Sequence, residues 1–152
     1  LLILSLMHLI RPAHAQDIEA ILQIWLDASK QAHDFIPTHF WQDQLLNMRD
    51  VYLPMAENYV IEHNDVVMGF ISLLKAEQFI AALFISPKFQ GQGLGSALLG
   101  FAQQQSNELN LQVYSENKDA VLFYLNHGFQ IINESIDEVT HHAQMDMHWI
   151  AQ

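Results

Sequence analysis

Three closely spaced glycines stand between an apolar run and a helical pattern in the stretch from residue 84 to 101. Gly91, Gly93 and Gly95 make up half of the chain's six glycines. Residues 79–85 before them are apolar, and apolar residues follow at i, i+3, i+4 and i+7 spacing, which indicates a strand, a turn and a helix. Glycines at such a junction let the backbone take left-handed angles and bring bare N–H groups close to a ligand. Together with the first helical turn, they predict a site for a phosphate or pyrophosphate.

Two familiar phosphate-binding motifs do not fit this spacing. A P-loop requires Lys and then Ser or Thr after its last glycine, whereas Ser96 and Ala97 follow here. A dinucleotide fingerprint requires glycine where Leu98 stands, so a dinucleotide-dependent enzyme is not favoured. The motif that is present reads Gln90-x-x-Gly93-x-Gly95.

A second motif runs from Asn117 to Phe129. Asn117 is suited to cap a helix, and Gly128 is suited to end it in a left-handed conformation, with Phe129 as the hydrophobic follower. The helix between them presents one apolar face, made of Ala120, Val121, Tyr124 and Leu125.

Both motifs resemble those of the GNAT N-acetyltransferase superfamily. The glycine motif is similar to its Q/R-x-x-G-x-G/A signature, and residues 117–129 resemble its N-x-x-A-x-x-F-Y-x-x-x-G-F motif at every defining position. The resemblance covers about residues 7–149. It implies an α/β fold of three layers, with a mixed, mostly antiparallel central sheet of about seven strands, about four helices and a splayed central strand pair.

The resemblance implies acetyl-CoA as the donor and a primary amine of a small molecule or protein as the acceptor. We expect the pyrophosphate on N–H groups of the segment Gln90, Gly91, Gln92, Gly93, Leu94, Gly95 and Ser96. The pantetheine arm is expected to pair like an extra strand with Leu83, Phe84 and Ile85, where N–H groups can also stabilise an oxyanion. By its motif position, Asn117 is expected to contact the same arm.

Tyr124 is the expected general acid. A thiol titrates near about 8.5 and a phenol near about 10, so a phenol can protonate the departing thiolate. Its position in the second motif also resembles that of the family's general acid.

A base is less evident, because residues 79–85, where this family often has a Glu, hold no titratable group. We expect proton removal through water, and the candidate relays are His33, Asp34, Glu77, His141 and His142.

The acceptor is expected to lie under the region between residues 29 and 54, again by the resemblance. The candidate substrate contacts there are His33, Asp34, Phe35 and Trp41, with His39 beside them. The alternative is that the aromatic rings belong to the core and the polar side chains are solvated.

Hydrophobic periodicity indicates the elements that must position these residues. A helix capped by Asp17 and another capped by Thr38 are expected before the glycine loop, and one helix follows each motif. Asn64 and Asp65 suit a tight hairpin turn, and Gly69 suggests a bulge or close backbone packing. The expected strands span residues 7–12, 58–62, 66–74, 79–85, 109–114, 130–136 and 144–150.

Length and composition favour one globular domain. The chain has 152 residues, of which 51% are apolar and 15% charged. We interpret Met7 as the natural start, with residues 1–6 an upstream extension and residues 7–152 a single domain. No apolar run reaches the roughly 18 residues of a membrane span, and the segment before residue 15 makes a poor signal peptide. A cytoplasmic protein is therefore expected.

The charge and the residue types exclude several functions. A net charge of −11 disfavours nucleic acid as a partner and is compatible with a cationic substrate. The absence of cysteine excludes disulfides and a thiol nucleophile. Nine histidines are present without an H-E-x-x-H motif, so no metal is expected. A catalytically weak, CoA-binding regulatory module stays the alternative, and the chain can be a monomer or a homodimer.

Overall fold

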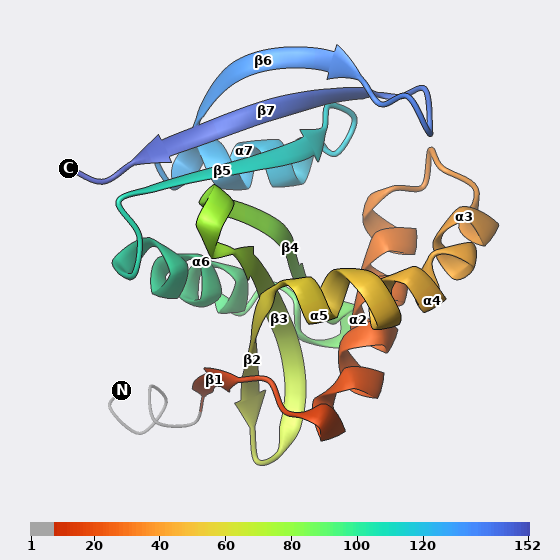
Figure 1. The fold of residues 1–152 in the computed structure, drawn as a ribbon, viewed down its shortest axis with the longest axis vertical. Helices are drawn as coiled ribbons and strands as arrows, with labels where there is room; N and C mark the ends of the chain where they lie inside the picture. The colour runs from red at the N-terminus through yellow and green to blue at the C-terminus, as the bar shows by residue number, and fades with distance from the viewer. Residues whose placement is uncertain (1–7) are drawn as a thin grey trace.

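The computed structural model describes residues 8–152, which form a mixed sheet of seven strands in the order β1-β2-β3-β4-β5-β7-β6 (Figure 1). Neighbours pair antiparallel except β4 and β5, which pair parallel. The expected fold class is thereby confirmed. The strands are β1 (Leu9–Pro12), β2 (Glu57–His63), β3 (Val66–Leu74), β4 (Phe79–Ile85), β5 (Glu108–Tyr114), β6 (Gln130–Ile136) and β7 (Ala143–Ile150).

The interpretation of Met7 and residues 1–6 concerns residues that lie outside the described part of the chain. Within residues 8–152, no helix is long and apolar enough to cross a membrane.

The main helices are α2 (Ile18–Ala32), α6 (Leu94–Gln104) and α7 (Lys118–Asn126). Between α2 and β2 the chain forms short pieces: α3 (Thr38–Asp43), α4 (Leu45–Asn47), a π turn (Met48–Tyr52) and α5 (Leu53–Met55). Short 3₁₀ turns span Ala15–Asp17, Lys75–Glu77 and Pro87–Phe89.

Helices cover both faces of the sheet, because its central strands are apolar on both sides. In β3, Phe70 contributes to one hydrophobic cluster and its neighbour Ile71 to the other. One cluster joins the sheet to α6 and α7, and the other joins it to α2, α3 and the short helical pieces. The result is the three-layer arrangement that Figure 1 shows, with α2 and α6 on opposite sides of the sheet.

The centre of the sheet is open. Strands β4 and β5 are paired at one position, Phe79 with Asn110, whereas β5 and β7 are paired along seven positions from Glu108 to Tyr114. Beyond Phe79 the two strands separate, which is the expected splayed pair. A register shift opposite Ser72 makes Ala81 an extra residue on β4, and such a bulge bends a strand and re-aims its backbone groups.

Glycine and turn positions behave as the sequence indicates. Asn64 and Asp65 have φ of 48° and 64°, as a tight hairpin turn between β2 and β3 requires. A Cβ on Gly69 would meet the Ile85 side chain and lie 2.9 Å from the Phe84 carbonyl oxygen, so close backbone packing explains this glycine.

The two expected helix caps have different outcomes. Asp17 stands at the N-cap position of α2, but its carboxylate makes no cap hydrogen bond and instead accepts from the Arg11 guanidinium at 2.8 Å and from the His14 N–H at 2.6 Å. Thr38 is the first residue of α3, after Pro37 at the cap position. Leu125, expected on the apolar face of α7, is 43% exposed and lies at the edge of that face.

Candidate active site

A groove of about 780 Å³ opens beside the glycine loop. The end of α2, the end of β4, the loop and the first turns of α6 and α7 form its walls. Among the lining residues are Ala28, Asp34, Leu83, Phe84, Ile85, Gln90, Gly91, Gly93, Leu94, Gly95, Ser96, Asn117, Lys118 and Tyr124. We call it the donor groove.

The glycine loop presents its backbone to the donor groove. Gly91 and Gly93 have φ of 80° and 79°, and a Cβ at either would meet no heavy atom within 4 Å. Gly93 is the N-cap of α6, so the N–H groups of the first turn, at Leu94, Gly95 and Ser96, have no partner within the helix. Bare N–H groups beside an open space suit a pyrophosphate. Gln92, also expected here, is exposed and does not line the groove.

Side chains hold this loop against its neighbours. Gln90 Nε2 donates to the Ile85 carbonyl at 3.2 Å, which fixes the loop to the end of β4. Ser96 Oγ lies 3.0 Å from His127 Nε2, and Gln103 donates to the His127 carbonyl at 3.0 Å. These contacts link α6 to the end of α7, and the one at Ser96 supports the first turn of α6 beside the groove.

The charged side chains of the donor groove are mostly acidic. Lys118 is accompanied by three carboxylates, those of Asp34, Glu116 and Asp119. An anionic ligand would therefore rely on the backbone N–H groups more than on side-chain cations.

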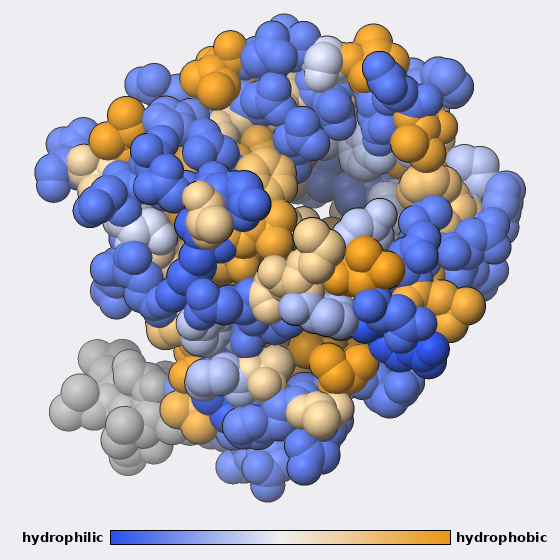
Figure 2. Space-filling view, viewed as in Figure 1, coloured by the Kyte–Doolittle hydropathy of each residue, from blue (hydrophilic) through white to orange (hydrophobic). Residues whose placement is uncertain are grey.

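A second cavity, of about 330 Å³, lies in the gap between β4 and β5. Its residues come from α2, α3 and α7, from both splayed strands, from the β6–β7 connection and from the start of β7. They include Trp25, His33, Trp41, Ile80, Ala81, Ala82, Leu83, Phe84, Leu111, Val113, Tyr114, Asn117, Tyr124, Asp137 and Gln144. We call it the acceptor cavity. Figure 2 shows the surface hollowed between the β5–β7 half of the molecule and the α2–α3 side.

The two cavities meet around Tyr124. Five residues line both of them: Leu83, Phe84, Asn117, Ala120 and Tyr124. A group bound in one cavity can therefore reach a group bound in the other at this junction.

Tyr124 lies on the buried face of α7 and is 8% exposed. Its ring contacts Phe123 and Phe129, at centroid distances of 5.2 and 5.5 Å. Burial raises the pKa of the Tyr124 hydroxyl, so it stays protonated at neutral pH. No side chain of residues 8–152 hydrogen bonds to that hydroxyl, which leaves its proton available to a ligand.

His33 forms part of the wall between the cavities. It is 7% exposed, stacks on Trp41 at 5.1 Å between ring centroids, and lies 3.3 Å from Asn117 Nδ2 through Nε2. Burial lowers the pKa of His33 to about 4, so the imidazole is neutral at physiological pH. Asn117 Oδ1 accepts from the Ala120 N–H at 3.3 Å, which confirms the expected cap and places the Asn117 amide between α2 and α7.

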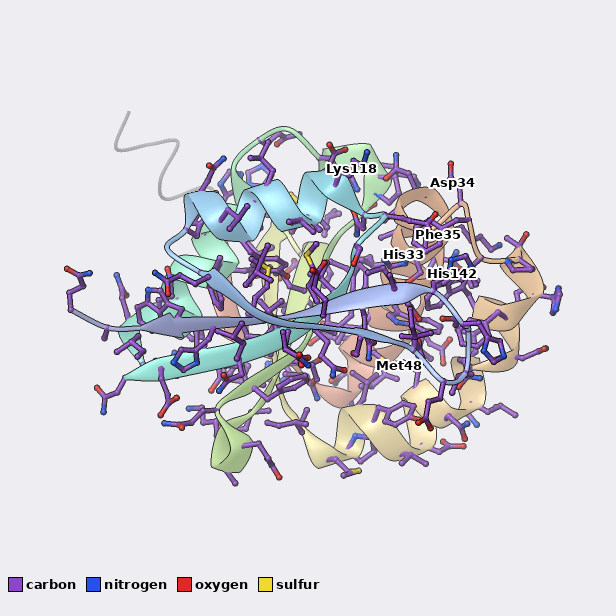
Figure 3. All side chains as sticks on the ribbon, turned by 90° about the horizontal axis from the view of Figure 1, so that it is seen from above. His33, Asp34, Phe35, Met48, Lys118 and His142 are labelled. Carbon is purple, nitrogen blue, oxygen red and sulfur yellow. The ribbon has the colours of Figure 1, made fainter. Side chains whose placement is uncertain are left out.

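The other expected substrate contacts occupy different places. Trp41 is buried and lines the acceptor cavity, whereas Asp34 lines the donor groove. Phe35 lines neither cavity and packs between Tyr114 and His142, at centroid distances of 5.6 and 5.0 Å. Figure 3 shows His33, Phe35 and His142 at the same end of the molecule as Lys118, the first residue of α7.

The candidate proton relays are also spread out. His142 Nδ1 lies 2.8 Å from Glu116, and His141 sits in the β6–β7 connection with φ of 64°. Neither of them lines the acceptor cavity, and nor does Glu77. Within residues 8–152, no group of three His, Asp or Glu side chains could hold a metal ion.

Sequence patterns do not predict the polar end of the acceptor cavity. The Tyr114 hydroxyl donates to Asp137 Oδ2 at 2.6 Å, and Thr140 Oγ1 donates to the same oxygen at 3.1 Å. Burial, and then the hydrogen bond to Asp137, raise the pKa of Tyr114 to about 12. A short loop between two expected strands carries Asp137, and a sequence pattern gives no sign that it faces a cavity.

A family model described as an acetyltransferase (GNAT) domain matches residues 54–131 of this chain. The match contains β2 to β5, the glycine loop, α6 and α7. It therefore includes all five residues that line both cavities, whereas α2, α3 and the β6–β7 connection lie outside it.

Named relatives and solved structures agree with that match. The chain is 36% identical to the peptidyl-lysine N-acetyltransferase YiaC of Escherichia coli K12 over 141 residues, which cover 93% of this chain and 96% of YiaC. It is 27% identical to apo YjaB of E. coli in its solution structure, with a TM-score of 0.82 over 95% of this chain and 99% of that one. The PaiA N-acetyltransferase of Thermoplasma acidophilum, solved in complex with coenzyme A, shares the fold at 16% identity, with a TM-score of 0.78 over 95% and 99% of the two chains.

Proposed function

This chain belongs to the GNAT acetyltransferase family, and from that premise we propose that it transfers the acetyl group of acetyl-CoA to the side-chain amine of lysine in peptides or proteins. The observation that carries this proposal is the junction of the two cavities at Tyr124. A long, open groove beside bare N–H groups suits the donor, and a smaller cavity between the splayed strands suits an amine on an alkyl chain.

The residues of the donor groove fit coenzyme A. The open space at Gly91 and Gly93 admits a bulky anion, and the first turn of α6 supplies N–H donors for a pyrophosphate. From that turn the groove leads past Ile85 and Phe84 to Leu83, along the backbone of β4. A pantetheine arm laid there would pair with strand edge groups that β5 leaves unpaired.

The chain's own groups then serve a direct attack of the amine on the thioester. Leu83 and Phe84 of β4, which follow the Ala81 bulge, line the junction, and a backbone N–H of this stretch can stabilise the charge that develops on the carbonyl oxygen. Tyr124 donates its proton to sulfur as the C–N bond forms and the C–S bond breaks. A thiolate leaving into this buried site is more basic than in water, which favours its protonation by a phenol of raised pKa.

The amine must lose a proton before it attacks. None of the β4 side chains can accept it, because this strand is apolar along its length. We propose that water carries the proton from the acceptor cavity to solvent. Burial lowers the pKa of His33 to about 4, which makes its imidazole a weak base at neutral pH. In such a water chain His33 would therefore serve as a neutral hydrogen-bonding group and not as the base.

The lysine acceptor is proposed because two observations support it. YiaC, at 36% identity over nearly the whole chain, is named a peptidyl-lysine N-acetyltransferase. The acceptor cavity is also lined largely by aromatic and aliphatic side chains, which suits four methylene groups ending in an amine.

The test is acetyl transfer to lysine peptides. We expect acetyl-CoA to bind in a calorimetric titration, and free thiol to appear when the protein, acetyl-CoA and a peptide with one free lysine are mixed. A matched peptide with arginine in place of lysine should release no thiol above background.

Each result has a definite meaning. Binding without thiol release on any lysine peptide would favour a CoA-binding regulatory module or another amine as acceptor. Failure to bind acetyl-CoA would refute the assignment of the donor groove.

A further inference from the structure

The acceptor cavity contains one ionised side chain. Of its 18 lining residues, Asp137 alone carries charge at neutral pH. The histidine that lines this cavity, His33, is neutral at that pH because burial lowers its pKa to about 4. A single negative charge in a mostly apolar cavity favours a cation as its ligand.

The carboxylate of Asp137 is held in place on three sides. Oδ2 accepts from the Tyr114 hydroxyl at 2.6 Å and from Thr140 Oγ1 at 3.1 Å, and Oδ1 accepts from the Val139 N–H at 3.0 Å. Partial burial raises the pKa of Asp137, but these hydrogen bonds outweigh burial and leave that pKa below its ordinary value. The group is therefore ionised throughout the physiological pH range.

The loop that carries Asp137 is closed by its own backbone. The Asp137 N–H donates to the His142 carbonyl at 2.9 Å, and the His141 N–H donates to the Asp137 carbonyl at 2.7 Å. The loop thus holds the carboxylate in position before any ligand arrives, which lowers the entropic cost of binding.

The hydroxyl oxygen of Tyr114 provides a second hydrogen-bond acceptor beside the Asp137 carboxylate. Because it donates its proton to Asp137, its oxygen is left as an acceptor, and a hydroxyl oxygen has two lone pairs. Thr140 Oγ1 lies 3.4 Å from the Tyr114 oxygen and occupies at most one of these two lone pairs. The other can accept an N–H from an amine.

We propose that Asp137 and the Tyr114 hydroxyl form the cation-recognition site of the acceptor cavity, selecting protonated primary amines on an alkyl chain over neutral groups of the same shape. Trp25, Trp41 and Leu111 would enclose the alkyl chain. The inference rests on the proposed function, because it concerns the acceptor of that reaction. Asp137 and Tyr114 are here specificity-determining residues.

Calorimetry on the full chain saturated with CoA tests this site, because CoA carries no acetyl group and no transfer follows. The two probes are Nα-acetyl-lysine amide and its neutral isostere Nα-acetyl-6-hydroxynorleucine amide. We expect the wild type to bind the amine at least about tenfold more tightly, as for a hydrogen bond to a charged group. Asp137→Asn should lose this preference and bind the alcohol as before.

Glu138→Gln is the matched control, because it removes the same charge from the neighbouring exposed residue, which does not line the cavity. It should keep the wild-type preference. An unchanged preference in Asp137→Asn would overturn the inference. Equal loss of both probes in that variant would also overturn it, because a purely structural role of Asp137 predicts that result.

Different results identify an error in the cation site and an error in the proposed acceptor. If wild-type protein releases thiol with the lysine amide and Asp137→Asn keeps the preference, the cation site alone is wrong. If wild-type protein neither binds nor acetylates the lysine amide, the proposed acceptor is wrong, and the cation site falls with it.

Discussion

Tyr124 combines two properties that conflict in an ordinary core residue. It is buried on the face of α7, yet the residue lines both cavities and its hydroxyl has no hydrogen-bond partner among residues 8–152. The hydroxyl oxygen is not among the buried side-chain atoms that lack a partner, so it is accessible and can donate its proton to a ligand. Its presence at this junction supports a role that is fulfilled only when a ligand is bound.

Tyr124→Phe should therefore lower kcat by about 10²- to 10⁴-fold, the usual contribution of a general acid, while the Kd for acetyl-CoA stays within about twofold. Steady-state thiol release and calorimetry measure the two quantities. The fold should be retained, because the ring and its contacts with Phe123 and Phe129 remain. Full activity in this variant would refute the acid role.

We expect His33 to affect the reaction through Asn117. Its Nε2 accepts from the Asn117 amide at 3.3 Å, across the wall that separates the two cavities. Gln at position 33 can present an oxygen near the place of Nε2, whereas Leu cannot. The pair of variants therefore separates the hydrogen bond from the volume of the side chain.

We expect His33→Leu to raise the KM for acetyl-CoA and to lower kcat, because Asn117 and the start of α7 lose their support. His33→Gln should recover most of both parameters. If His33 instead contacts the acceptor directly, the KM for the lysine peptide should rise in both variants while the KM for acetyl-CoA is unchanged.

At the scale of elements, the junction of β4, the glycine loop and α6 is the part that sequence predicts best. Strand β4 begins and ends where expected, and Gly91 and Gly93 adopt the left-handed angles that glycine allows. Local chemistry determines these features, since few other residues tolerate such angles. Gly128 follows α7 with φ of 88° for the same reason, whereas Asn117 begins the helix through the hydrogen bond that its side chain accepts.

Gly93→Ala and Gly100→Ala form a matched pair that tests this junction. Gly93 has φ of 79°, so alanine there should lower the free energy of unfolding by about 1 kcal/mol and weaken acetyl-CoA binding. Gly100 lies inside α6 with open space around it, so alanine there should add about 0.5–1 kcal/mol of stability and leave binding unchanged. Urea unfolding and calorimetry measure both effects, and equal behaviour of the two variants would contradict the assigned role of the loop.

The region between α2 and β2 was predicted less well, and the reason is physical. No glycine marks the π turn at Met48–Tyr52, and Pro54 lies in the first turn of α5, where proline is tolerated, instead of ending the helical region.

Two carboxylates also depend on partners that a local sequence pattern does not contain. The Asp17 carboxylate binds Arg11 of β1, six residues away, and the rule for helix caps does not consider such a partner. Asp137 was missed because its environment is created by β5, which lies distant in sequence.

At the scale of the whole molecule, the buried imidazole of His33 makes stability depend on pH. Its pKa falls from 6.5 to about 4 on folding, so the unfolded chain binds more protons between these values. This contribution is fully present above pH 6.5 and is lost as pH falls toward 4. One such group accounts for about 3 kcal/mol, at about 1.4 kcal/mol per pKa unit.

Urea unfolding at several pH values between 7 and 4 measures this effect. The loss of stability across the window should be smaller in His33→Gln than in wild type, because Gln does not titrate. His39→Gln, which changes an exposed histidine, should follow the wild-type curve. The depressed pKa values of Asp17 and Asp137 add a further loss at lower pH that all three proteins share.

The single paired position between β4 and β5 divides the sheet into two half-sheets, β1–β4 and β5–β7. In amide hydrogen exchange, groups of Ala82 to Ile85 that face the gap should therefore exchange faster than those of β3, which have partners on both sides. A pantetheine arm bound along β4 would slow them. The donor would then act as a removable strand, and the two half-sheets would unfold together in the loaded enzyme but more independently in its absence.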